Sequence, residues 1–237
     1  LASVKLHAPN LLADSAWLTY GRVQLVASHA FLYGFALPAG LAVSLWLVAR
    51  LGRNPLELPA IVSAGAVLWN LAVLVGSIAI LIGDGTGFDW LEYPGYAAVP
   101  LFIAYLLIGW GALETFRRRR EPTLYPSQWF LLAAWFWFPW VYSTANLLLQ
   151  YAPVRGILQT TVAWWYVGNL TFVWFGFVGL AALFYVVPSL TGRPLYSRYH
   201  AMIAFWLLVL FNGWRGIPPH APLPSWMASA GTVCSVL

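Results

Sequence analysis

A succession of long apolar runs, separated by short charged loops, constrains this chain more than any other feature. A helix that crosses the hydrocarbon core of a bilayer needs about 20 predominantly apolar residues. Seven runs reach or approach that length: 24–49, 58–83, 95–116, 127–150, 160–188, 199–216 and 223–237. Because lipid offers no hydrogen-bond partners, each run must satisfy its backbone internally. We therefore predict an all-α fold, a polytopic transmembrane helix bundle with about seven spans, the last of them truncated.

The composition excludes an ordinary water-soluble domain. Charged residues make up only 8% of the chain, whereas a soluble globular domain carries roughly a quarter. We expect one transmembrane domain over residues 1–237, with residues 1–22 as an extramembrane lead-in that lacks the apolar core of a signal peptide. The single cysteine, Cys234, cannot form an internal disulfide.

Loop charges predict the orientation of the bundle. Arginines gather after the first, third and fifth runs, whereas the loop after the second run is acidic. The residues concerned are Arg50, Arg53, residues 117–120, Arg193 and Arg198 on one side, and Asp84, Asp89 and Glu92 on the other. The positive-inside rule places the arginine-rich loops in the cytoplasm. The net charge of +5 therefore indicates topology and a lipid bilayer as partner, not nucleic acid. We expect the three carboxylates to lie in a solvated outer loop, since they lack the spacing of a calcium loop.

The segment W-W-Y-V-G-N at residues 164–169 lies inside a long apolar run. It resembles the copper-binding helix of subunit I of the C-type (cbb3-type) haem–copper cytochrome c oxidases, which reads W-W-Y-G-H-N. Similar stretches extend the resemblance through nearly the whole chain. They are residues 18–22 with Gly34, residues 83–94, residues 119–130, and residues 204–226. The chain is similar to a divergent member or fragment of that family.

The resemblance assigns the family's ligand positions to residues of this chain. A low-spin haem ligand corresponds to Ala27, copper ligands to Gly168, Pro218 and Pro219, and the active-site tyrosine to Asn212. Alanine, glycine and proline side chains offer no donor to a metal. The resemblance thus implies that this chain does not bind copper, whereas haem b as a cofactor is compatible with the resemblance. No catalytic residue and no metal ligand is assigned.

His29 is the histidine that lies well inside a predicted span. An ionisable residue within the membrane is a candidate functional site, and we therefore name His29 as a candidate cofactor-binding residue. The alternative is a neutral imidazole that is hydrogen-bonded between helices. Two residues turn a helix by about 200°, so His29 should point away from the side occupied by Ala27. His7, His200 and His220 lie in or near loops, where a ligand role is less favoured.

The resemblance implies an integral membrane protein of a respiratory electron-transfer complex in the bacterial inner (cytoplasmic) membrane. The family's chemistry is electron transfer from a c-type cytochrome to dioxygen, with other oxidase subunits, including c-type cytochromes, as partners. Because the assigned ligands are replaced, whether the chain is an enzyme stays open. The alternative is a non-catalytic scaffold or docking subunit of an electron-transfer assembly. A transporter or channel that reuses the bundle has no substrate signature in this sequence.

Overall fold

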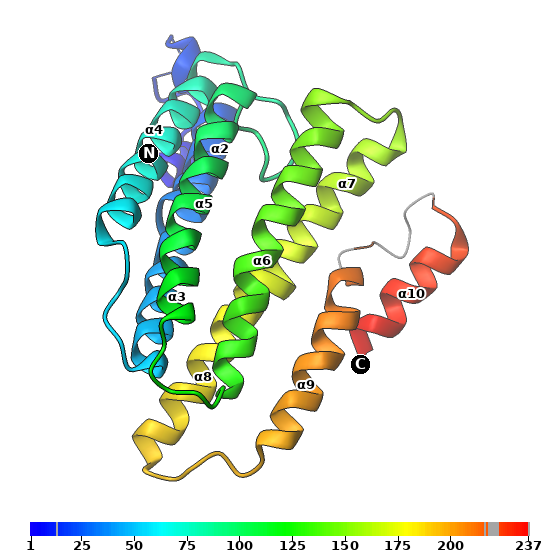
Figure 1. Cartoon of the computed structure of the whole chain (residues 1–237). Helices are drawn as coiled ribbons and strands as arrows, with labels where there is room; N and C mark the ends of the chain where they lie inside the picture. The colour runs from blue at the N-terminus through cyan, green and yellow to red at the C-terminus, as the bar shows by residue number, and fades with distance from the viewer. Residues whose placement is uncertain (13, 216, 218–222, 237) are drawn as a thin grey trace.

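The computed structural model describes residues 1–12, 14–215, 217 and 223–236, and this part of the chain is helical without strands (Figure 1). Its α-helices are α1 (Ala2–His7), α2 (Tyr20–Phe31), α3 (Leu37–Gly52), α4 (Pro59–Ile82), α5 (Gly95–Arg117), α6 (Pro126–Asn146), α7 (Ile157–Gly168), α8 (Gly176–Thr191), α9 (Arg198–Phe211) and α10 (Ser225–Val236). Three π-helical segments and two short 3-10 turns connect or extend them: η2 (Leu32–Ala36), η3 (Leu147–Tyr151), η4 (Asn169–Phe175), η1 (Ala16–Leu18) and η5 (Asn212–Trp214). The predicted all-α fold is confirmed.

Four helical stretches are long and apolar enough to cross a membrane: Tyr20–Gly52, Pro59–Ile82, Gly95–Arg117 and Ile157–Thr191. The first runs through η2 and the last through η4, so each is one continuous helix. A polytopic bundle is therefore confirmed, but the count of seven spans is not. Helix α6 is 21 residues long, yet its Trp, Tyr and polar residues make it less apolar. Helix α9 has 14 residues and continues into η5, and α10 has 12 residues up to the end of the described chain.

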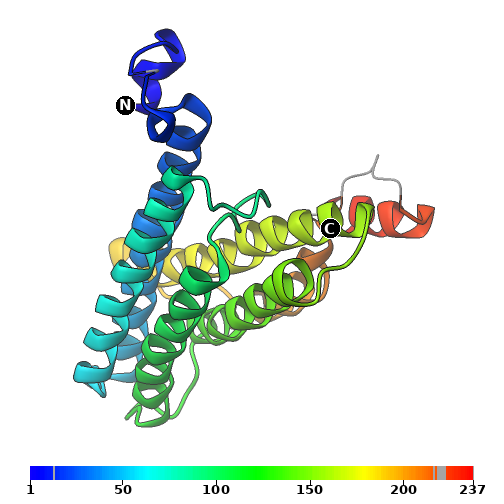
Figure 2. The same cartoon turned by 90° about the horizontal axis from the view of Figure 1, so that it is seen from above.

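Helices α4 and α5 lie side by side in both views, with α3 beside them, and α6 contacts the α7–α8 helix (Figures 1 and 2). Glycine permits the close approach of α4 to α5. A Cβ atom on Gly65 would lie 2.8 Å from Ile108 Cγ1 and 3.0 Å from the Ala104 carbonyl oxygen. Small residues at a helix contact have this effect in membranes, where association depends on close packing.

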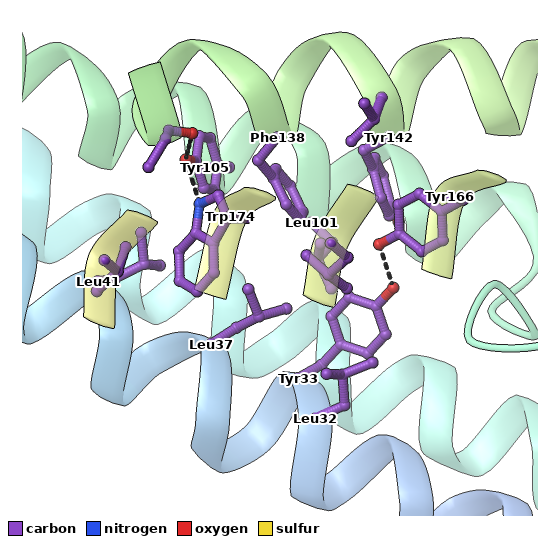
Figure 3. Packing of buried hydrophobic residues seen from close by; sticks show 14 of the residues in the cluster. Leu32, Tyr33, Leu37, Leu41, Leu101, Tyr105, Phe138, Tyr142, Tyr166 and Trp174 are labelled. Atoms are coloured by element: carbon purple, nitrogen blue, oxygen red, sulfur yellow. Dashed lines mark hydrogen bonds between the residues drawn. The ribbon is translucent and has the colours of Figure 1, made fainter. Parts of the chain in front are cut away.

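A layer of large buried side chains fills the space between α3, α5, α6 and η4 (Figure 3). Trp174 on η4 is buried, and its indole nitrogen donates to the Tyr105 hydroxyl at 3.0 Å. Tyr33 and Tyr166 join their hydroxyl groups at 2.7 Å, which links η2 to α7. These bonds satisfy polar atoms that have no access to water or lipid headgroups.

Arg22 fixes the start of the first long helix against the end of the second. Its guanidinium donates to the Ala16 carbonyl at 3.0 Å and to the Leu81 carbonyl at 2.9 Å. The lead-in before it contains α1, whose buried Lys5 donates its ammonium group to the Leu11 carbonyl. The extramembrane position of residues 1–22 stays a prediction.

Candidate functional site

His29 lies buried on α2, with both ring nitrogens close to oxygen atoms. Nδ1 is 3.0 Å from the Leu25 carbonyl oxygen of the preceding turn, and Nε2 is 2.9 Å from Glu92 Oε2. A carbonyl oxygen only accepts, so Nδ1 must carry a proton. The Nε2–Oε2 pair is a close polar contact between two buried residues, but its geometry gives neither atom a hydrogen-bond partner among the described residues.

Two tyrosine rings enclose this histidine. The ring centroid of Tyr93 lies 4.7 Å from that of His29, and the centroid of Tyr33 lies 5.6 Å away. Gly76 on α4 leaves room for the Tyr93 ring, because a Cβ atom there would lie 2.5 Å from it. Burial raises the pKa of Tyr93, so its hydroxyl group stays neutral. The contacts support the packing interpretation of His29, and its cofactor role stays a prediction.

The expectation of a solvated acidic loop is wrong for Glu92, which is only 4% exposed. Asp84 and Asp89 are exposed, as expected. Leu91 and Tyr93, the apolar neighbours of Glu92, are both buried and draw this part of the loop into the bundle. A carboxylate between two large apolar residues was the sequence signal that could have indicated the burial.

Ala27 and His29 point to opposite sides of α2, as the helix geometry predicted. Ala27 lines a hollow of about 680 Å³ between α2, η2 and η4, which His29 does not line. The polar side chains of this hollow are amide and hydroxyl groups, such as those of Gln24, Ser28 and Thr171. None of its lining residues is a histidine, cysteine, methionine or carboxylate, so the hollow does not offer an axial ligand to a haem iron.

Gly168 and Asn212 lie in a region held by amide hydrogen bonds. Gly168 is the buried last residue of α7. The Asn212 amide donates to the Phe172 carbonyl at 2.8 Å. The neighbouring Asn169 donates to the Gly213 carbonyl at 3.1 Å. Both bonds join two different helical segments, so both amides serve packing.

The other candidates remain apart from one another. His7 and His200 are exposed, whereas Pro218, Pro219 and His220 lie outside the described residues. In the part of the chain that the structure describes, no three His, Cys, Asp or Glu residues come together as a metal site would require.

Comparison with known proteins identifies the family. The family model for Cytochrome C and Quinol oxidase polypeptide I matches residues 1–237. The chain is 27% identical over 249 residues to the cbb3-type cytochrome c oxidase subunit CcoN1 of Stutzerimonas stutzeri. That alignment covers 99% of this chain and 51% of the relative. It is 28% identical over 249 residues to the bacteroid cytochrome c oxidase subunit 1 homolog of Bradyrhizobium diazoefficiens, and that alignment covers 98% of this chain and 44% of the relative. The chain spans about half the length of the curated relatives that it matches. Because the family model matches the whole given sequence, the chain belongs to the cytochrome c and quinol oxidase polypeptide I family.

Proposed function

We propose that this subunit I-like protein contributes a helical scaffold to a respiratory electron-transfer complex of a bacterial cytoplasmic membrane. On this proposal, it does not form a copper centre of its own. One observation carries the proposal. The positions that the resemblance assigns to metal ligands hold Ala27 and Gly168, and the polar groups nearby are already engaged in packing.

The copper argument depends on donor chemistry. Copper in proteins is bound by imidazole or sulfur ligands. Alanine and glycine supply neither, and the amide at Asn212 already donates to the Phe172 carbonyl. These residues support a packed interior at this place rather than an open metal site.

The haem argument depends on His29. An imidazole binds iron through a nitrogen lone pair, but both ring nitrogens of His29 are directed at protein oxygens. Iron binding would require the ring to leave Glu92 and expose a buried carboxylate. That cost favours the scaffold role over a haem-carrying role. The proposal therefore includes no electron transfer through a haem bound to His29.

The partner proposal follows from the names of the relatives, which are subunits of cytochrome c oxidases. We propose that other oxidase-type subunits, including c-type cytochromes, assemble with this chain. Affinity purification from mildly solubilised membranes, followed by a peroxidase stain for covalently bound haem c, tests this assembly. Recovery of a stained band with the tagged chain is expected, and its absence would remove the partner proposal.

The metal proposal is tested by optical spectra of the full-length protein in its oxidised and dithionite-reduced states, together with iron and copper analysis. A relative with all family ligands, purified in the same way, is the control. We expect no stoichiometric copper and no haem bands. Haem with stoichiometric copper would overturn the proposal. Haem without copper would replace the scaffold by an electron-transfer role, and the spectrum of His29→Ala would then show whether His29 holds the iron.

A further inference from the structure

Three arginines converge on a pocket at the arginine-rich end of the bundle. The pocket has a volume of about 280 Å³ and lies between the end of α3, the loop before α6 and the start of α9. These elements meet at the lower end of the bundle in Figure 1. Arg50, Arg53 and Arg198 line it, together with Glu121, Tyr125 and Gln128. Loop charges place this end of the bundle at the cytoplasmic face of the membrane.

The pocket carries an excess of positive charge. Three arginines against one glutamate leave a formal charge of +2. Glu121 lies 3.7 Å from Arg53 and accepts a hydrogen bond from Thr123. Arg50 donates to the Tyr185 hydroxyl at 3.1 Å. Within the described part of the chain, neither Arg50 nor Arg198 forms an ion pair, and Arg198 lies over the Tyr125 ring with its Cζ 5.7 Å from the ring centroid. Two guanidinium groups therefore remain for an anion from outside the protein.

A buried amide group faces the same pocket without an acceptor. Gln128 is 1% exposed, and its Oε1 accepts from the Tyr125 backbone N–H at 2.9 Å. Its Nε2 has no hydrogen-bond partner among the described residues. A buried donor without an acceptor is unfavourable. A ligand rich in acceptor oxygens would satisfy this group and the two arginines together.

The surroundings of the pocket favour a lipid as the source of that ligand. Trp46 lies one turn before Arg50 on α3, within the membrane span Tyr20–Gly52, and is 52% exposed. Its ring packs edge-on against Tyr185, with centroids 5.3 Å apart. An apolar surface thus continues from the arginines along the span. An acyl chain can lie along Trp46 while its headgroup reaches Arg50.

We propose that this pocket binds the phosphate headgroup of an anionic phospholipid from the inner leaflet. Arg50, Arg198 and the Gln128 amide donate to the phosphate oxygens, and Glu121 keeps Arg53 in place. Basic pockets between helices on the cytoplasmic side are suited to such headgroups. The assignment goes beyond the proposed scaffold role and depends on no haem, metal or partner subunit.

Native mass spectrometry of the purified chain in detergent, titrated with phosphatidylglycerol, tests the pocket. The double variant Arg50→Gln/Arg198→Gln should bind this lipid about fivefold more weakly for each arginine removed. The matched control Arg117→Gln/Arg193→Gln removes the same charge from the same face outside the pocket and should leave the affinity within about twofold. Equal losses in the two double variants would overturn the site.

Gln128→Glu tests the amide donor of the pocket. Glutamate keeps an oxygen for the Tyr125 N–H, so the start of α6 is retained, but it replaces the Nε2 donor by a carboxylate oxygen that repels the phosphate oxygens. We expect loss of phosphatidylglycerol binding with unchanged helix content by circular dichroism. Wild-type binding in this variant would overturn the proposal. So would equal binding of phosphatidylcholine, which lacks net charge, or full displacement of the lipid by an equal concentration of inorganic phosphate.

Discussion

At the scale of single residues, His29 and Glu92 supply each other's polar partner in a region that lipid and apolar side chains otherwise surround. Removing one member of such a buried pair leaves the other without compensation, which costs more than the pair contributes. The sequence indicated that His29 needs a partner. It did not indicate which one, because Glu92 follows 63 positions later and lies in a loop whose fold depends on tertiary packing.

Glu92→Ala should lower the free energy of unfolding by about 3 kcal/mol, because the buried ring of His29 loses the carboxylate that lies 2.9 Å from its Nε2. Asp89→Ala in the same loop is the control and should change it by about 0.5 kcal/mol or less, since Asp89 is exposed. Unfolding by SDS in mixed micelles, followed by tryptophan fluorescence, measures both. Equal effects would show that Glu92 is not held by His29. The double variant His29→Ala/Glu92→Ala should cost less than the two single variants together.

At the scale of helices, most boundaries could be predicted. The expected runs 58–83 and 95–116 correspond to Pro59–Ile82 and Gly95–Arg117. Proline at the first turn of α4 and Gly83, with φ of +98° after its last turn, are signals that sequence displays directly. The π-helical segments could not be predicted, because the spacing of apolar residues in their sequences is the same as in an α-helix. Likewise, no sequence signal indicated that α9 ends before the 3-10 turn η5 within the expected run 199–216.

Gly65→Ala and Gly179→Ala should change stability in opposite directions. At Gly65 the new methyl group meets Ile108 and the backbone of α5, so we expect a loss of about 1–3 kcal/mol. At Gly179 on α8 nothing lies within 4 Å, and alanine should stabilise the helix by up to about 1 kcal/mol. Denaturation in mixed micelles compares the two. A gain at Gly65 would contradict the close approach of α4 and α5.

Asn169 ties three elements together through one amide. Its oxygen accepts from the Trp137 indole on α6 at 2.8 Å, and its nitrogen donates to the Gly213 carbonyl on η5 at 3.1 Å. Asn169→Ala should therefore cost about 1–3 kcal/mol, because it leaves buried partners unsatisfied.

The matched control for Asn169 is Asn70→Ala. The Asn70 amide is exposed and bonds only the Ala66 carbonyl of its own helix. We expect a change of about 0.5 kcal/mol or less in the same unfolding measurement. If the two alanine variants unfold alike, the amide of Asn169 does not hold α6, η4 and η5 together.

At the scale of the whole molecule, fold class and family could be predicted, and both are confirmed. Apolar run length forces helices, and the motif at residues 164–169 carries the family resemblance. The packed interior around Asn169 and Asn212 could not be predicted, since it depends on how π-helical turns orient their side chains. The absence of a copper centre stays a proposal that metal analysis decides.

The orientation of the bundle is testable with single cysteines. In a Cys234→Ala background, we expect Asp89→Cys to react with a membrane-impermeant maleimide in intact cells. Tyr196→Cys, at a fully exposed position in the opposite loop, should react only after the membrane is opened. Loop charges give this expectation. Labelling of Tyr196→Cys in intact cells would invert the topology and place the proposed lipid pocket in the outer leaflet.

The π-helical segments have a consequence for how this fold tolerates changes in chain length. A π turn holds one residue more than an α turn, and each residue turns an ideal helix by about 100°. A residue lost within Leu32–Ala36 or Asn169–Phe175 would convert the wide turn into an ordinary one without breaking the helix. The same deletion in the middle of α4 would rotate half of a tightly packed helix away from α5. We expect relatives with one residue more or fewer inside a helix to carry that insertion or deletion in these two segments. The two longest helices can change length there without losing their packing.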